Sequence, residues 1–437
     1  MSVSHRYSYA DAEQYLRSLE LFGMRFGLER MRRLMTALDS PHERFRSIQV
    51  VGTNGKSSTA RMTAALLERH GVRAGAYLSP HLGSFAERIE VGGQPSSKQR
   101  FAAAVGRAAK AAELVDRGLE PGDQVTQFEA LTAAAYRLLA ESGVEVAVVE
   151  AGLGGRYDAT SVIRADVLVV TNVGLEHTRW LGPSERHIAE EKLAVVPTGG
   201  TLVSGPLGPD ALAVAERVID ERGAELRLLG RDFAVREGEG GTFAVQTPLA
   251  AYDEIALAPL GAFQHTNFAV AVSAAEAFLG RLGAAAVRKA AAALRLPGRL
   301  EVVSERPLVV LDGAHNPSAA RALRPSLQAL LAGRELVAVV SVLDDKDAAG
   351  ILGELLSLAR NVVFTRSSNA RALPPAVLES LNRQLSGPAS EVVTDPVAAL
   401  ARARALAGRD GAVLVTGSIY LLSDLVRARS LGSSEVA

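Results

Sequence analysis

The stretch Val50-Val51-Gly52-Thr53-Asn54-Gly55-Lys56-Ser57-Ser58-Thr59 is the basis of the fold class that we predict. The run 48–51, rich in β-branched residues, predicts a β-strand, and residues 57–70 predict a helix. A glycine-rich turn between a strand and a helix is typical of a phosphate-binding loop, because glycines let backbone N–H groups approach phosphate oxygens and the helix N-terminus adds its dipole. In such a loop Lys56 would reach the β- and γ-phosphates, and a following hydroxyl would serve Mg²⁺.

The loop does not match the full phosphate-loop pattern, which has a glycine where Val50 stands. It matches the shorter form Gly-Thr-Asn-Gly-Lys-Ser. The competing interpretation is a tight strand-to-helix turn that carries an incidental lysine. We favour phosphate binding because the strand before the loop and the helix after it are both predicted.

Short apolar runs alternate with Ala- and Leu-rich helical stretches on both sides of the loop. The runs 144–150 and 167–171 lack polar alternation, which suits parallel strands covered on both faces by helices. A second alternating series follows Pro297-Gly298. We therefore predict an α/β protein. A P-loop NTPase-like, mostly parallel sheet domain with N-terminal helices spans 1–297, and a smaller Rossmann-like α/β domain spans 298–437.

Residues 201–259 carry weaker strand patterns, such as the run 242–246. We assign this stretch to the edge of the first domain's sheet.

Composition excludes several classes of function. The 437 residues are too many for one ordinary core, and 48 basic residues balance 48 acidic ones, which argues against a nucleic-acid-binding surface over the whole protein. The chain has no cysteine, so disulfides, thiolate metal sites and thioester chemistry are excluded. No run reaches the ~20 apolar residues that span a bilayer, and the N-terminal residues lack the apolar stretch of a signal peptide. We expect a cytoplasmic monomer with no nucleic-acid or membrane partner.

The motif 52–56 resembles the phosphate loop of the Mur ligase superfamily, and other motifs resemble its folylpolyglutamate synthase/dihydrofolate synthase branch. These motifs occur in order at residues 28–30, 77–82, 87–89, 126–129, 150–160, 171–177, 191–192, 264–267, 297–299, 312–317, 345–347 and 416–420. Each is weak alone, but their joint presence in order is specific.

The resemblance implies an ATP-dependent ligase that activates a carboxylate as an acyl phosphate and joins it to the amine of L-glutamate. The acceptor would be dihydropteroate or a folate. The implied catalytic residues are Lys56, Lys192 and His315. The implied ATP-binding residues are Gly52, Thr53, Asn54, Gly55, Lys56, Ser57, Ser58, Gln264, Asn267, Arg299 and Asp312.

The resemblance also implies two Mg²⁺ ions. It assigns Ser79, Glu150 and His177 to one ion, and the last two residues end predicted strands, where ligands of parallel sheets gather. Lys192, as a carbamate, would hold a second Mg²⁺, and burial would supply the neutral amine that carbamylation needs. Taken singly, a strand-end glutamate is more often in a salt bridge, a lone histidine more often a hydrogen-bonded core residue, and a helix lysine more often exposed and paired with a neighbouring glutamate.

The resemblance further implies a substrate site, for which we name His81, Arg88, Phe128, Arg156, Asp158, Ala159 and Lys346. The alternatives are a plain strand-to-helix turn at 152–158 and a solvated turn at Lys346. Ser57, Ser161 and Glu176 depart from the commonest pattern of the folate branch.

Two other functions stay open. One is a Mur-type ligase for a different carboxylate, and the other is a phosphate-loop ATPase outside folate metabolism. Against the second, no apolar strand ends in a Walker B aspartate, and the second domain has ligand-like motifs of its own. A pseudoenzyme would be expected to have lost Lys56, Glu150 or His177, and all three are present.

Overall fold

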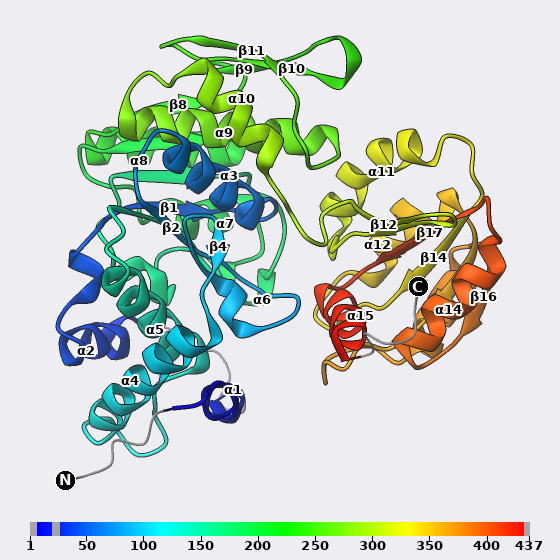
Figure 1. The fold of residues 1–437 in the computed structure, drawn as a ribbon, viewed down its shortest axis with the longest axis horizontal. Helices are drawn as coiled ribbons and strands as arrows, with labels where there is room; N and C mark the ends of the chain where they lie inside the picture. The colour runs from blue at the N-terminus through cyan, green and yellow to red at the C-terminus, as the bar shows by residue number, and fades with distance from the viewer. Residues whose placement is uncertain (1–6, 20–26, 432–437) are drawn as a thin grey trace. The chain divides into compact units, whose positions relative to one another are not determined.

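The computed structural model describes residues 7–19 and 27–431 and has two compact units. The first unit holds the described residues up to Ser79 together with 84–257 and 266–294, and the second holds 80–83, 258–265 and the described residues from 295 onward. Figure 1 shows the elements of each unit. Both units are built around mostly parallel sheets, so the predicted α/β fold class is confirmed.

The large sheet of the first unit has eight strands, and from β2 to β8 neighbouring strands run parallel. Two short antiparallel strands, β3 and β4, extend it at one edge. In spatial order its strands are β4 (Gln94–Pro95), β3 (Ile89–Val91), β2 (Ala74–Tyr77), β5 (Val146–Glu150), β1 (Arg46–Val51), β6 (Val167–Val170), β7 (Thr201–Ser204) and β8 (Glu225–Leu228).

Helices of the first unit cover both faces of this sheet. Their bounds are α1 (Tyr9–Ser18), α2 (Glu29–Ala37), α3 (Lys56–Arg69), α4 (Lys98–Asp116), α5 (Gln127–Glu141), α6 (Thr178–Leu181), α7 (Glu185–Leu193), α8 (Pro209–Arg222), α9 (Ala262–Leu279) and α10 (Ala284–Ala293), with 3₁₀ turns η2 (Pro41–Glu43), η3 (Phe85–Arg88), η4 (Ala159–Val162) and η5 (Glu239–Gly241). Residues 262–265 at the start of α9 belong to the second unit. One core packs α1, α2, α4 and α5 against β2 and β5, and another packs α7 and α8 against β6 and β7.

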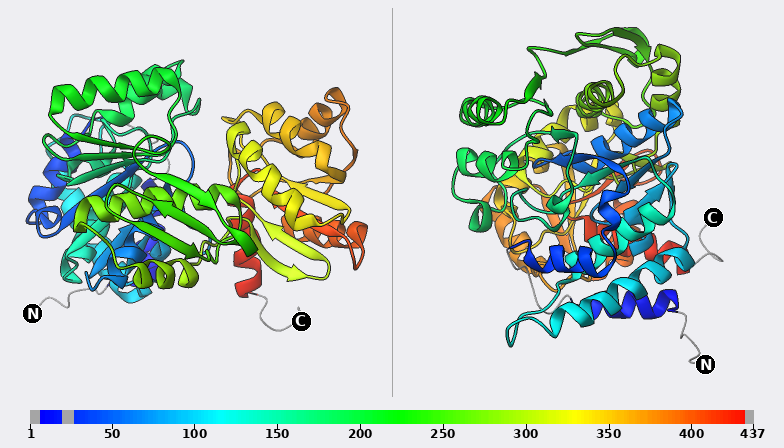
Figure 2. Two further views of the ribbon diagram at one scale, coloured as in Figure 1. Left: turned by 90° about the horizontal axis from the view of Figure 1, so that it is seen from above. Right: turned by 90° about the vertical axis from the view of Figure 1, so that its left-hand side faces the viewer.

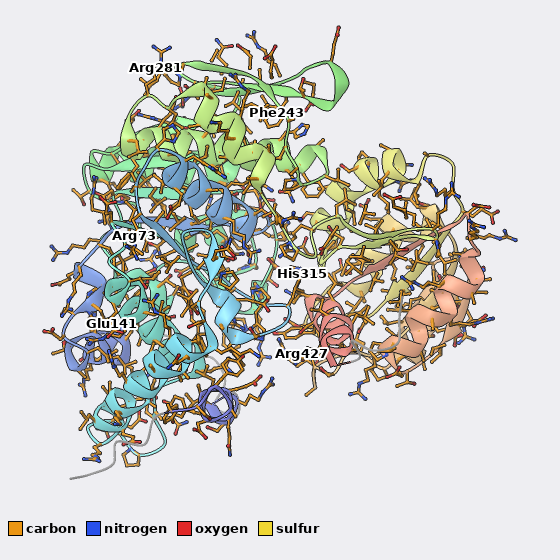
Figure 3. All side chains as sticks on the ribbon, in the orientation of Figure 1. Arg73, Glu141, Phe243, Arg281, His315 and Arg427 are labelled. Carbon is orange, nitrogen blue, oxygen red and sulfur yellow. The ribbon has the colours of Figure 1, made fainter. Side chains whose placement is uncertain are left out.

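The assignment of 201–259 to a sheet edge was wrong for half of that stretch. β7, α8 and β8 do extend the large sheet, but β9 (Ala234–Glu237), β10 (Phe243–Gln246) and β11 (Ala251–Ile255) form a separate antiparallel sheet. Figure 2 shows these strands apart from the large sheet, and in Figure 3 Phe243 is labelled on β10. The Phe243 ring packs edge-to-face on Phe268 of α9, with centroids 6.0 Å apart. This apolar anchor belongs to a helix distant in sequence, so local strand patterns could not reveal it.

The second unit has a six-stranded sheet that is parallel except for its first strand. Its spatial order is β12 (Glu301–Glu305), β13 (Leu308–Leu311), β17 (Ala412–Thr416), β14 (Leu336–Val340), β15 (Ala359–Phe364) and β16 (Ala389–Val392). The helical elements are α11 (Pro317–Leu331), α12 (Ala348–Leu355), η6 (Leu356–Leu358), α13 (Pro375–Gln384), α14 (Pro396–Ala407) and α15 (Ile419–Leu431). Separate buried clusters line the two faces of this sheet. In the described part of the chain, no helix has the length and apolar character needed to cross a bilayer.

Candidate active site

The turn between β1 and α3, the predicted phosphate loop, contains two glycines that its geometry requires. Gly52 has φ +146°, and a Cβ there would lie 1.9 Å from Thr171 Oγ1. Gly55 has φ +82°, a left-handed conformation that L side chains rarely adopt, and a Cβ there would lie 2.5 Å from Asn267 Oδ1. The strand, turn and helix that the sequence predicted are thus present, with α3 beginning at Lys56.

The segment that follows β6 fixes the conformation of this loop. Asn172 accepts a hydrogen bond from Asn54 N at 3.0 Å and donates one to Asn54 O at 3.0 Å. Thr171 Oγ1 also donates to Asn54 O, at 2.6 Å. The Thr53 hydroxyl accepts from Gly174 N at 3.1 Å. The sequence analysis named the motif 171–177 but gave Thr171 and Asn172 no role, because their hydrogen bonds to Asn54 join segments more than a hundred residues apart.

Two lysines meet at one carbonyl oxygen of the loop. Lys56 Nζ donates to Gly52 O and to Thr53 O, both at 3.1 Å, and Lys192 Nζ donates to Gly52 O at 2.7 Å. Lys192 is 4% exposed, as predicted for a buried amine. Burial, with the nearby Lys56 ammonium adding to it, lowers the pKa of Lys192 to about 7. The Lys56 ammonium therefore lies where phosphate oxygens would bind, beside a buried amine that loses its proton more easily than an ordinary lysine.

Glu150 ends β5 beside the start of α3. Its Oε1 lies 2.9 Å from the Ser57 hydroxyl, which donates to it, and its Oε2 accepts from Ser79 N at 2.8 Å. Glu150 is 2% exposed. The structure thus brings together the predicted residues Ser57, Ser79 and Glu150. The side chains of Ser57 and Glu150 carry hard oxygen donors of the kind that Mg²⁺ prefers. In the described ranges, no group of three or more His, Cys, Asp or Glu side chains forms a ready-made metal cage.

His177 is the N-cap of the short helix α6 and adopts a left-handed conformation, with φ +52°. Its Nε2 lies 3.9 Å from Glu176 Oε1. The Glu176 carboxylate also raises the pKa of Lys192, against the larger effects of burial and Lys56 that lower it. Glu176, one of the departures from the family pattern, is therefore electrostatically coupled to the Lys192 side of the loop.

The glycine-rich loop 152–158 follows β5 and packs closely on its neighbours. A Cβ on Gly152 would lie 2.7 Å from the Phe128 ring. The Arg156 guanidinium bonds to Glu191 at 2.9 Å, and the Asp158 carboxylate accepts from Leu153 N at 2.8 Å. Burial raises the pKa of Asp158. The hydrogen bonds shown for Asp158 thus hold the loop itself, and its assignment to the substrate, with that of the neighbouring Ala159, stays a prediction.

Residues 28–30 and 126–129 belong to two motifs to which the sequence assigned no structural role. Arg30 Nε donates to both carboxylate oxygens of Glu129 at 3.1 Å, and both side chains are buried. Glu129 in turn accepts from Thr126 N at 2.8 Å and completes the capping box of α5. The helix that carries Phe128 is therefore positioned by a buried ion pair.

Two predicted substrate residues follow β2. The Arg88 guanidinium lies over the Phe85 ring, 5.3 Å from its centroid. His81 belongs to the second unit, where its Nε2 lies 3.4 Å from Arg427 Nη2. Arg427, labelled in Figure 3, comes from α15 and also donates to Gly83 O at 3.3 Å. The stretch 80–83 is therefore held by the last described helix.

Other predicted residues of the second unit surround the carboxyl end of β13. Asp312 accepts from Leu300 N and Ala314 N, both at 2.8 Å, and burial raises its pKa although the Arg299 charge opposes this. His315, labelled in Figure 3, places Nδ1 2.9 Å from Gly313 O. A Cβ on Gly313 would lie 3.0 Å from an Arg299 nitrogen. These residues form one cluster at the end of a parallel strand, where ligands of α/β sheets bind.

Two predicted residues are more buried than their sequence context indicated. The Lys346 side chain is 9% exposed and lies 4.0 Å from Asp345, so it is not the solvated turn lysine that its charged neighbours favoured. Gln264 is fully buried on α9, three residues before Asn267. No local signal in the sequence separates these residues from surface polar groups.

Comparison with known proteins supports the family resemblance that the sequence motifs indicated. Residues 298–419 match the family model "Mur ligase, glutamate ligase domain". The chain is 32% identical over 432 residues to the dihydrofolate synthase/folylpolyglutamate synthase of Bacillus subtilis, covering 96% of this chain and 98% of that one. It is 37% identical to a probable bifunctional folylpolyglutamate synthase/dihydropteroate synthase of Haloferax volcanii, of which it spans 50%.

A solved structure of Mycobacterium tuberculosis folylpolyglutamate synthase, complexed with ADP and AMPPCP, superimposes with a TM-score of 0.90. The two sequences are 33% identical, and the match covers 98% of this chain and 99% of that one. Fold and site thus define a ligase with a phosphate loop and a Mur-type C-terminal domain. The chain belongs to the folylpolyglutamate synthase/dihydrofolate synthase family.

Proposed function

We propose that this chain is an ATP-dependent ligase that joins L-glutamate to dihydropteroate, to a folate, or to both, through an acyl phosphate. The observation that carries the proposal is the meeting of the Lys56 ammonium and the buried Lys192 amine at Gly52 O in the phosphate loop. Glu150 and Ser57 stand beside them. Together these groups supply positive charge for phosphate oxygens and oxygen donors for a cation, which are the two needs of phosphoryl transfer.

The reaction has two covalent steps. A carboxylate oxygen of the folate substrate attacks the γ-phosphorus of ATP; the new O–P bond forms as the bond to ADP breaks. The glutamate amine then attacks the acyl carbon, loses a proton, and the C–O bond breaks to release phosphate. Lys56 leaves its two loop carbonyls to bind β- and γ-oxygens, so its charge is available as negative charge shifts onto ADP.

Mg²⁺, when bound, would neutralise phosphate charge and orient the γ-phosphate. Glu150 and Ser79, with the Ser57 hydroxyl, would hold one ion, and His177 is the further residue that the family resemblance assigns to it. The depressed pKa of Lys192, about 7, leaves a neutral amine available for carbamylation, which supports a second Mg²⁺ there. Gln264, Asn267, Arg299 and Asp312 stay as predicted ATP contacts, and His81, Arg88, Phe128, Arg156, Asp158, Ala159, His315 and Lys346 as predicted contacts of the other substrates.

The test is phosphate release from ATP with Mg²⁺ and glutamate, with dihydropteroate in one reaction and tetrahydrofolate in another. Glutamate-dependent release in both reactions identifies a bifunctional enzyme, and release in one identifies a single activity. Lys56→Ala should lower turnover by at least ~10²-fold, comparable to the loss of one key electrostatic donor. Release with neither acceptor, while ATP still binds, would reject the folate assignment in favour of a ligase for another carboxylate.

A further inference from the structure

Gln49 is a buried polar side chain in the central strand β1, with apolar Ile48 and Val50 as its chain neighbours. It lies on β1 between β5 and β6 and is 2% exposed. Its Nε2 donates to Ser161 Oγ at 2.9 Å and lies 3.2 Å from Thr160 Oγ1. Burying an amide in a sheet core is costly unless its hydrogen bonds are made, so this contact must compensate for a substantial desolvation penalty.

Ser161 connects Gln49 to the glycine-rich loop through a second hydrogen bond. Its hydroxyl has one hydrogen, and because Gln49 Nε2 can only donate, that hydrogen is left for Gly155 O at 2.6 Å. The direction of the relay is therefore fixed, from the Gln49 amide through the Ser161 hydroxyl to the Gly155 carbonyl. An alanine at 161 could neither accept nor donate, whereas a threonine could do both.

Gly155, whose carbonyl accepts this hydrogen bond, packs directly against the backbone of α7. A Cβ on Gly155 would lie 2.8 Å from Glu191 O and 2.9 Å from Lys192 O, and Arg156 N donates to Glu191 O at 3.0 Å. Lys192 Nζ then returns to Gly52 O. These contacts form a closed ring, which begins at Gln49 of β1 and ends at Gly52, directly after the same strand.

We propose that Gln49 and Ser161 are positioning residues that hold the loop 152–158 against α7 and so set the acceptor side of the active site. The proposal rests on the ligase function proposed above, because it assigns the loop at the carboxyl end of β5 to the carboxylate substrate. It also gives a role to Ser161, which departs from the commonest family pattern at this position. Neither residue needs to touch substrate, since both act through the Gly155 carbonyl.

Ser161→Ala and Ser161→Thr test the relay, and Ser47→Ala is a matched control. Ser47 lies on β1 two residues before Gln49, is also 2% exposed, and donates to Arg164 O at 3.2 Å. Hydrogen exchange of peptides covering 152–158 should speed up several-fold in Ser161→Ala, but not in Ser161→Thr or Ser47→Ala. Equal exchange in Ser161→Ala and Ser47→Ala would overturn the proposal. This readout needs no activity, so it decides about the relay even if the chain uses neither folate acceptor.

Steady-state kinetics separates positioning from simple loss of folded protein. In Ser161→Ala the KM for the folate acceptor should rise roughly three- to tenfold, the equivalent of one hydrogen bond, while the KM for ATP stays within about twofold. A merely structural role would lower kcat through the active fraction and leave both KM values unchanged, which would contradict the proposal. Gln49→Leu should raise the same KM and add little to Ser161→Ala in the double variant, because the two residues act in series. Additive effects would show that they act independently.

Discussion

At the scale of single residues, the phosphate loop depends on backbone geometry that only glycine provides cheaply. Gly55 and Gly71 have nearly the same dihedral, φ +82° and φ +81°, but a Cβ on Gly71 meets nothing within 4 Å. Both alanine substitutions therefore add the same left-handed strain, about 1–2 kcal/mol. Only Gly55→Ala also displaces Asn267.

We expect Gly55→Ala to raise the KM for ATP at least about tenfold, because the loop amides can no longer approach phosphate oxygens in their present conformation. Gly71→Ala should lower unfolding free energy by the backbone strain alone, about 1–2 kcal/mol, and leave the KM for ATP unchanged. Steady-state kinetics and urea unfolding of both variants check this. If the two variants had equal KM values, the close approach at Gly55 would have no functional role.

Lys192 gives the molecule a pH dependence of known sign. Its pKa falls from the ordinary 10.5 to about 7 in the folded protein, so between these values the unfolded chain binds more protons than the folded one. Unfolding free energy must then rise with pH in this window and become independent of this group below about pH 7. The unfolding free energy of the parent protein minus that of Lys192→Met should therefore increase from pH 7 to pH 9 in denaturant titrations. A difference that stayed flat would show that Lys192 titrates normally.

At the scale of elements, the buried ion pair between α2 and α5 is a specific point of stability. The Arg30 and Glu129 side chains are 9% and 5% exposed, whereas those of the helical pair Arg17 and Glu13 are 45% and 30% exposed. Glu129→Ala removes one of the two carboxylates that Arg30 contacts and leaves Asp123, 3.3 Å from Arg30 Nη1, so it should lower unfolding free energy by about 1.5–3 kcal/mol, the range for a hydrogen bond to a charged group. Glu13→Ala should cost at most ~0.5 kcal/mol. Equal losses in urea unfolding would contradict this account of how α5 is positioned.

Elements with strong local patterns were predictable from the sequence. The predicted helix 57–70 corresponds to α3 (Lys56–Arg69), shifted by one residue at each end, because its apolar residues have helical spacing and a glycine-rich turn precedes it. The separate sheet β9–β11 was not predictable, because its packing partner Phe268 is distant in sequence. The proposed role of Gln49 could not be predicted either, because its partner Ser161 is also distant in sequence. A glutamine between Ile48 and Val50 in a predicted strand does indicate that a buried amide needs a hydrogen-bond partner.

At the scale of the whole molecule, two α/β units were predicted from the alternation of strands and helices, and each unit has its own sheet and buried core. The predicted site residues were found through a family resemblance that covers most of the chain, and the structure supplies what holds them. The resemblance could name Lys192, for example, but not its bond to Gly52 O or the Gly155 contact on its backbone. Such contacts join segments that only the folded chain brings together.

The proposed mechanism requires a carboxylate oxygen of the folate substrate to attack the γ-phosphate of ATP. Substrate whose reacting carboxylate carries ¹⁸O tests this directly, with the released phosphate analysed by mass spectrometry. The acyl-phosphate route predicts that each phosphate released together with ligated product carries one oxygen from the labelled carboxylate. Ligation with unlabelled phosphate would contradict the account, because the carboxylate would then have been activated in another way.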